Sequence, residues 1–340
     1  MCDDMSTCPG STKYLLPMIE GHGDDAYRYD HISVDFSSNI CHHGGHGALM
    51  EHLAGRPDLV AHYPEPEAWS LEAQIAERHH LHPRQVIVTS GATEAIYLIA
   101  QAFRWQPTIQ TPTFSEYEDA CAMYPYEKHT EKVLWLCNPN NPTGEVCGQK
   151  QIEEMLAQYD LVVIDQSYEN YTGSEPVSPQ WAVAMGCVVQ IHSLTKTYAV
   201  PGLRLGYITA SSPLAETIRS CMRPWSVSAL AIEAGRYLLQ HDELRCKPDL
   251  AEAQRLRRNL METGGVDVLP TQTNFMLCRL CEGTAAELKD YLARRHGMLI
   301  RDASNFRGLG PRHFRVAAQT PQENDRLVAA IQQYFLQCTK

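Results

Sequence analysis

A lysine among hydroxyl side chains, directly after an apolar run, is the strongest chemical signal in the sequence. Lys196 lies in residues 192–204, beside Ser193 and Thr195 and eight residues before Arg204. Burial and a nearby cation lower the pKa of an amine and make it a nucleophile and proton carrier, so Lys196 is a candidate for imine formation. The hydroxyls and the guanidinium would hold a phosphate. A lone lysine after a strand is more often a solvated surface residue, so this interpretation depends on the surrounding motifs.

Two other apolar runs end in polar side chains. Asp165 ends the run 161–165, where open α/β sheets place ligand-binding groups, and it would pair with a protonated pyridine nitrogen. Asn141 lies in residues 137–144, whose two prolines and glycine fix an irregular path, and its amide would donate to a phenolate oxygen. Taken alone, such an aspartate caps a turn and such an Asn-Pro cluster is only a turn.

A third motif runs from a predicted strand into a predicted helix at residues 89–94. The backbone amides here and the Thr93 hydroxyl would lie at a helix N-terminus, which favours a bound phosphate, although a plain helix cap is the alternative. Phe114 offers a ring that would stack on a flat cofactor, although such an aromatic is more often core.

The elements that would position these residues alternate between strand and helix. Apolar runs predict buried strands at 86–89, 133–137, 161–165, 188–191 and 205–209, with helical patterns at 93–103 and 151–159. This predicts an α/β fold with a mostly parallel central sheet flanked by helices. After residue 225, long helical patterns at 226–241, 249–262, 285–295 and 321–335 predict a smaller α+β domain. We expect an N-terminal segment (1–44) that joins the small domain and the substrate site, a large cofactor-binding domain (45–225) and a small domain (226–340).

Together, these segments resemble fold-type I pyridoxal-phosphate enzymes of the aminotransferase superfamily, from about Asp35 onward. The resemblance implies an aspartate aminotransferase-like fold and pyridoxal 5'-phosphate as cofactor. It implies that Lys196 carries the cofactor as a Schiff base, that Asp165 pairs with its ring nitrogen, and that Asn141 and Tyr168 contact its ring oxygen. It also implies stacking by Phe114 and a phosphate site made of Gly91, Ala92, Thr93, Ser193, Thr195 and Arg204.

The resemblance also predicts the assembly. Tyr63 matches a tyrosine that, in such enzymes, completes the phosphate site of the partner subunit. The chain is therefore expected to form an obligate homodimer with shared active sites.

Two groups within the superfamily remain candidates for the activity, threonine-phosphate decarboxylases of cobalamin biosynthesis and histidinol-phosphate aminotransferases. Residues 35–39, 112–117, 193–204, 224–227 and 299–310 resemble the decarboxylases more. That resemblance implies decarboxylation of L-threonine O-3-phosphate to (R)-1-amino-2-propanol O-2-phosphate. Arg315 would hold the substrate carboxylate with Asn39, and Arg301 and His22 would reach the substrate phosphate.

The sequence departs from the decarboxylase pattern at three places. Gln166 replaces an acidic residue, Ser228 replaces an asparagine, and residues 41–47 replace an Asn-Pro-Leu-Gly-like turn. Both reactions need the same cofactor contacts, so the aminotransferase stays the alternative.

Composition excludes other classes. The 29 Lys and Arg against 40 Asp and Glu leave a net charge of -11 without a basic block, which disfavours nucleic acid and anionic membranes as partners. The same lack of a basic face or DNA-binding module disfavours a non-catalytic cofactor-sensing domain. Residues 1–10 lack the pattern of a secretion signal, and the 12 dispersed cysteines predict reduced thiols in a cytoplasmic protein. The histidine-rich residues 41–47, and Cys278 with Cys281, lack a second pair of ligands, so no metal site is expected.

Overall fold

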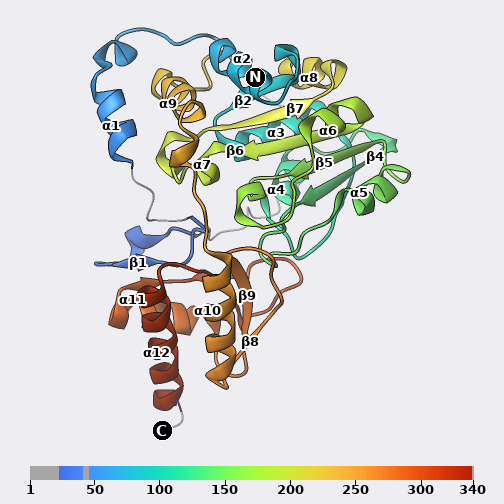
Figure 1. Ribbon diagram of the computed structural model, residues 1–340. Helices are drawn as coiled ribbons and strands as arrows, with labels where there is room; N and C mark the ends of the chain where they lie inside the picture. Colours follow the sequence, from blue (N-terminus) through green and yellow to red (C-terminus); the bar gives the residue numbers. More distant parts are fainter. Residues whose placement is uncertain (1–22, 41–45, 339–340) are drawn as a thin grey trace, which may run out of the picture.

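The computed structural model of the protein describes residues 23–40 and 46–338 (Figure 1). Its centre is a six-stranded sheet in the order β2-β7-β6-β5-β4-β3. These strands are β2 (Val86–Thr89), β3 (Trp105–Ile109), β4 (Lys128–Cys137), β5 (Leu161–Asp165), β6 (Val188–Ser193) and β7 (Gly206–Ala210). Strands β3 to β6 are parallel, whereas β7 runs antiparallel to both β6 and β2. The predicted α/β fold with a mostly parallel sheet is confirmed.

Helices cover both faces of this sheet, because its central strands are apolar on both sides. One face packs against α3 (Gly91–Ala102), α4 (Glu116–Met123) and α8 (Ser212–Arg219). The other face packs against α5 (Gln149–Leu156) and α6 (Pro179–Met185). The β2–β7 end of the sheet is covered by α1 (Gly47–Ala54), α2 (Trp69–Arg78) and α9 (Ala229–Leu239).

A second lobe lies below this sheet in Figure 1 and has its own core. Its elements are α10 (Leu250–Glu262), β8 (Val266–Val268), β9 (Phe275–Leu280), α11 (Ala285–His296), β10 (Met298–Leu299), β11 (Arg301–Asp302), β12 (His313–Ala317) and α12 (Pro321–Cys338). An antiparallel sheet in the order β11-β12-β9-β8 packs against its helices. Strand β1 (Val34–Asp35) pairs in parallel with β10, so these two residues of the N-terminal segment belong structurally to this lobe.

The boundary predicted at residue 225 assigns α9 to the small domain, whereas α9 packs with helices of the large lobe. Helix α9 follows that boundary, but its apolar residues Ile232, Ala234 and Leu238 pack into the cluster under α1 and α2. Helix α10 is the first helix to pack in the second core. We propose that the boundary between the lobes lies between α9 and α10.

Short elements connect these parts. They are the four-residue helix α7 (Leu194–Thr197) and the 3-10 turns η1 (Ala26–Arg28), η2 (Pro57–Val60), η3 (Pro83–Gln85), η4 (Glu169–Tyr171), η5 (Pro201–Leu203) and η6 (Asp242–Leu244). Within the described residues, no helix has both the length and the apolar character needed to cross a membrane.

Candidate active site

A cavity of about 220 Å³ opens where β4, β5 and β6 end, and residues of both lobes and of the N-terminal segment line it. Twelve of the predicted site residues are in its wall. The large lobe contributes Ala92, Thr93, Phe114, Asn141, Asp165, Tyr168, Ser193, Thr195, Lys196 and Arg204, and the small lobe contributes Arg301 and Arg315. The chain therefore brings most of the predicted site residues into one pocket.

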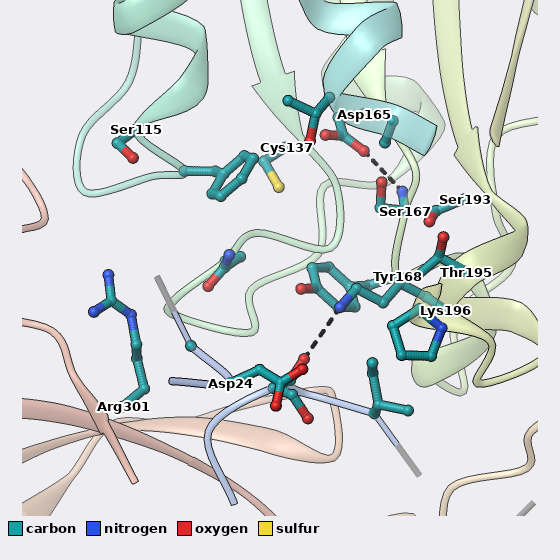
Figure 2. A pocket seen from close by; sticks show the side chains of 18 of the residues that line it. Asp24, Ser115, Cys137, Asp165, Ser167, Tyr168, Ser193, Thr195, Lys196 and Arg301 are labelled. Carbon is teal, nitrogen blue, oxygen red and sulfur yellow. Dashed lines mark hydrogen bonds between the residues drawn. The ribbon is translucent and has the colours of Figure 1, made fainter. Parts of the chain in front are cut away.

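Lys196 points its amine into the middle of the pocket from α7 (Figure 2). Its Nζ donates a hydrogen bond to the carbonyl of Ser38, at 3.1 Å. Burial, and then the charges of Arg315 and Arg204, lower the pKa of this amine to about 8, although Asp24 acts in the opposite direction. A substantial fraction of the amine is thus neutral near neutral pH, as attack on an aldehyde requires.

Asp165 ends β5 at the closed end of the pocket. The Tyr117 hydroxyl donates to its Oδ2 at 2.7 Å, and the Ser167 amide donates to its Oδ1 at 2.9 Å. Burial raises the pKa of this carboxyl, while the hydrogen bonds from Ser167 and Tyr117 favour its charged form. No lysine or arginine within the described residues forms a salt bridge with it. A buried carboxylate of this kind suits a cationic ring nitrogen.

Asn141 and Tyr168 line the pocket between these two groups. Asn141 Oδ1 accepts a hydrogen bond from Arg315 Nη1, so its Nδ2 group is the one left to donate. Burial raises the pKa of Tyr168 to about 12, although the charge of Arg315 acts in the opposite direction. The phenol therefore stays protonated at neutral pH. Phe114 packs edge-on against Tyr117, with ring centroids 5.8 Å apart. The contacts of these three residues to a cofactor ring and its oxygen stay a prediction.

Another part of the pocket wall offers donors that could hold an anion. Ala92 and Thr93 lie in the first turn of α3, near the Ser193 and Thr195 side chains. Gly91 has a φ of +82°, and a Cβ at this position would lie 2.7 Å from Arg204 Nη2, so glycine is what lets this guanidinium approach the helix. Gly91 itself is not in the pocket wall.

Two buried arginines of the small lobe face the same cavity. Arg315 on β12 donates to Asn141 Oδ1 and to the Ser37 carbonyl, and burial lowers its pKa. Arg301 on β11 donates to Asn305 Oδ1 at 2.9 Å, and burial with the neighbouring Arg315 charge lowers its pKa to about 10. A pocket with two buried cations is suited to a substrate with two anionic groups.

Besides Gly91, three predicted site residues are not among the described residues of the pocket wall. Asn39 is fully buried, has a φ of 58°, and its side chain lies close enough to the Tyr168 hydroxyl to lower the pKa of that phenol. Its part in holding the substrate carboxylate stays a prediction. Tyr63 is 86% exposed and lies against Trp225, with ring centroids 5.4 Å apart. His22 falls outside the described residues, as do residues 41–45 of the histidine-rich stretch.

Several pocket residues were missed by the sequence analysis. Tyr117 closes the predicted segment 112–117, but nothing in a linear pattern shows that its hydroxyl reaches Asp165. Asp24, Ser37 and Ser38 come from the N-terminal segment, of which only residues 35–39 carried a motif. Cys137 and Phe306 lie inside the segments 137–144 and 299–310 but were given no role there, and Ser167 lies two residues after Asp165, so the period of two along extended backbone is the signal that would have found it.

The fold and the pocket are those of an α/β enzyme in which Lys196, the Asp165 carboxylate and the first turn of α3 line one cavity. The chain belongs to the aminotransferase class I and II family, whose model matches residues 32–130 and 124–331. The crystal structure of L-threonine-O-3-phosphate decarboxylase from Porphyromonas gingivalis superposes with a TM-score of 0.84 at 36% identity, over 89% of this chain and 99% of that one.

Curated sequences give two further relatives. The threonine-phosphate decarboxylase of Salmonella typhimurium is 28% identical over 334 residues, which cover 88% of this chain and 90% of that protein. Histidinol-phosphate aminotransferase 1 of Mannheimia succiniciproducens is 26% identical over 328 residues, 88% of each chain. The family is thereby established, and both predicted groups of relatives are found in it.

Proposed function

We propose that this protein is a pyridoxal-phosphate enzyme that decarboxylates L-threonine O-3-phosphate to (R)-1-amino-2-propanol O-2-phosphate, a step of cobalamin biosynthesis. The observation that carries the choice of substrate is the pair of buried guanidiniums, Arg301 and Arg315, that face the Lys196 amine across one small cavity. Threonine phosphate has one carboxylate and one phosphate for these two cations. Histidinol phosphate has a phosphate and an imidazole but no carboxylate, so in the alternative reaction the second cation would serve 2-oxoglutarate, and the assay below separates the two reactions.

The pocket residues fit the cofactor. Asp165 would pair with its ring nitrogen, Lys196 would hold its aldehyde carbon, Asn141 and Tyr168 would contact its ring oxygen, and Phe114 would lie against its ring. Its phosphate would lie at the first turn of α3, with Ser193, Thr195 and Arg204. When bound, the cofactor supplies an electron sink for the bond that breaks at the substrate Cα.

The protein's own residues would select which bond that is. Arg315, fixed by its hydrogen bonds to Asn141 and the Ser37 carbonyl, would bind the substrate carboxylate and so orient the bond between this group and Cα for cleavage. After carbon dioxide leaves, Lys196 Nζ would return a proton to Cα, and its pKa of about 8 suits this acid–base role.

The proposal is tested by incubating purified protein with the cofactor and threonine phosphate, and measuring carbon dioxide and aminopropanol phosphate. Release of both in equal amounts is the expected result. A matched assay supplies histidinol phosphate and 2-oxoglutarate. Glutamate formed there, with no carbon dioxide from threonine phosphate, would establish the aminotransferase instead.

The predicted homodimer remains part of this proposal. Large apolar side chains are exposed on one chain at Met50, Val60, Tyr63, Trp69 and Trp225, all on or next to the helices around α1 and α2. A partner subunit there would cover these side chains and receive the Tyr63 hydroxyl in its phosphate site. The described cysteines are free thiols, in keeping with the proposed cytoplasmic location.

A further inference from the structure

Behind the pocket, on the face of the sheet turned away from it, lies a closed ring of hydrogen-bonded polar groups. It consists of the side chains of Gln166, Glu169, His192, Thr209 and Gln190 and the backbone of Val177, and is called the buried ring below. His192, Gln190 and Thr209 are fully buried, and the Glu169 side chain is 17% exposed. Buried polar side chains are costly unless every donor and acceptor is matched, so their full pairing here calls for a reason.

The bonds run around the ring without a gap. Val177 donates its amide to Gln166 Oε1 at 3.0 Å, and Gln166 Nε2 donates to Glu169 Oε2 at 3.2 Å. Both Glu169 oxygens lie 3.2 Å from His192 Nδ1, and His192 Nε2 lies 3.3 Å from Thr209 Oγ1. Thr209 donates to Gln190 Oε1 at 3.0 Å, and Gln190 Nε2 returns to the Val177 carbonyl at 2.8 Å.

The donors and acceptors of the ring fix where its protons lie. The Val177 carbonyl can only accept, so Gln190 turns its Nε2 group toward Val177 and its Oε1 atom toward Thr209. Gln190 Oε1 therefore accepts the one proton of the Thr209 hydroxyl. Thr209 Oγ1 must then accept from His192 Nε2. Because His192 Nδ1 faces a carboxyl group, the Glu169–His192 pair shares one further proton. Burial raises the pKa of Glu169, but the charge and hydrogen bond of His192, together with the charges of His79 and Arg245, outweigh it and lower this pKa, so the carboxyl is the ionised member of the pair.

Ring members alternate along the chain with residues of the pocket wall. Gln166 stands between Asp165 and Ser167, and Glu169 follows Tyr168. His192 precedes Ser193 on β6, whose neighbour β5 carries Asp165. At the end of β5 and on β6, successive side chains point to opposite faces, so holding Gln166 and His192 on one face holds Asp165 and Ser193 on the other. Glu169 instead begins the 3-10 turn η4, whose first bond runs from its amide to the Gln166 carbonyl, so the ring fixes this turn next to Tyr168.

We propose that Glu169 and His192 form a buried ion pair that positions the pocket, because the ring it closes fixes the backbone of residues 165–169 and 192–193. This inference rests on the proposed cofactor site. It also explains the departure at Gln166, since an acid there would place a second carboxylate about 3.2 Å from Glu169 with no proton between them.

The other groups around the pair do not take its proton. His79 stacks on His192 with ring centroids 5.9 Å apart, and burial followed by the His192 charge lowers the pKa of His79 to about 4. Tyr207 stacks on His192 at 4.5 Å, and burial raises the pKa of its phenol. Arg78 and Arg245 are more distant charges that remain cationic.

The test uses the cofactor-free protein and three substitutions. Glu169→Gln keeps every bond of the ring, because its amide can donate to His192 Nδ1 and accept from Gln166. Glu169→Ala opens the ring at the pair, and Thr209→Val opens it on the other side without a change of shape. Cofactor dissociation constants are measured by equilibrium titration at a temperature where each variant is folded, so a simple loss of stability does not register.

We expect Glu169→Gln to bind the cofactor within about threefold of wild type, and Glu169→Ala and Thr209→Val to bind it about tenfold more weakly, the effect of one lost hydrogen bond. Glu243→Gln is the matched control, because Glu243 forms a similar pair with His241 on the surface, at 2.8 Å. It should bind as wild type does. Nitrogen NMR of histidine-labelled protein at neutral pH should show two protonated ring nitrogens at His192, and Glu169→Gln should remove one proton.

A single proton on His192 in the wild-type protein would refute the ion pair, and unchanged cofactor binding in both ring-opening variants would refute the positioning role. Failure of the wild-type protein itself to bind the cofactor would instead overturn the proposed function. The NMR measurement does not depend on the cofactor, so these failures are distinguishable.

Discussion

Replacing Tyr117 by phenylalanine removes one hydrogen bond to Asp165 and leaves the surrounding packing in place. The Tyr117 ring is fully buried, stacked on Trp135 at 5.5 Å and packed against Phe114 at 5.8 Å, and phenylalanine keeps both contacts. The lost bond, 2.7 Å long, joins a hydroxyl to a buried carboxylate. Hydrogen bonds to charged groups contribute about 1.5 to 3 kcal/mol, so the charged form of Asp165 is destabilised by that order.

Cofactor affinity and pH dependence should both change in Tyr117→Phe. The cofactor should bind roughly ten- to hundredfold more weakly, because its ring nitrogen needs the carboxylate that Tyr117 stabilises. A hydrogen bond to the charged form lowers a carboxyl pKa, so its loss raises the pKa of Asp165 further above the ordinary value. Activity that requires ionised Asp165 is lost as the pH falls, and this loss should begin at a higher pH in the variant. Cofactor titration and a pH–rate profile measure the two effects, and a variant with wild-type affinity and an unshifted acid limb would refute the reasoning.

Four other predictions follow from the same contacts. Cofactor-free protein should capture pyridoxal phosphate faster as the pH rises through about 8, where Lys196 becomes neutral, and Lys196→Ala should show no imine absorbance at any pH. Arg315→Lys should raise the KM for substrate about tenfold with a smaller change in kcat, because one ammonium cannot keep the forked contacts; an unchanged KM would argue against a role in carboxylate binding. Mixing Tyr63→Phe chains with Lys196→Ala chains should restore activity above the sum of the parents, provided that subunit exchange is verified, and no gain would exclude action across a dimer. Lys289→Met should destabilise the protein by about 3 kcal/mol in denaturant unfolding, because it strips the buried Asp25 carboxylate of the ammonium 2.6 Å away; a loss below about 1 kcal/mol would mean that this pair is solvated.

The sequence predicted best the parts of the fold that depend on local pattern. The strands at 86–89 and 161–165 have the predicted bounds, because each is a short apolar run between polar residues. Strand β3 was missed. It is an edge strand with a proline and half-exposed residues, so it lacks the apolar continuity of a buried strand.

The site was predictable where a short motif carries several contacts, as around Lys196. It was not predictable where a contact joins distant segments. The bond between Tyr117 and Asp165 spans 48 residues, and the bond between Arg315 and Asn141 spans 174. Neither hydrogen bond leaves a periodic pattern in the sequence that would reveal it. The buried ring was hidden for a related reason, since Gln166 and Glu169 look like loop residues until β6 and β7 complete their hydrogen bonds.

The contacts of residues 25–38 imply an order in which the pocket forms during folding. Strand β1 lies on β10 of the second lobe, Asp25 is tied to Lys289 of α11, and the Ser38 carbonyl receives the Lys196 amine. These partners are separated in the chain by 158 to 264 residues, so the floor of the pocket can form only after both lobes have folded and docked. A ligand of this pocket would therefore bind the finished fold and no earlier state. At a hundred times its dissociation constant it would add about 2.7 kcal/mol to the free energy of unfolding, which makes supply of the ligand a control on how long each chain survives.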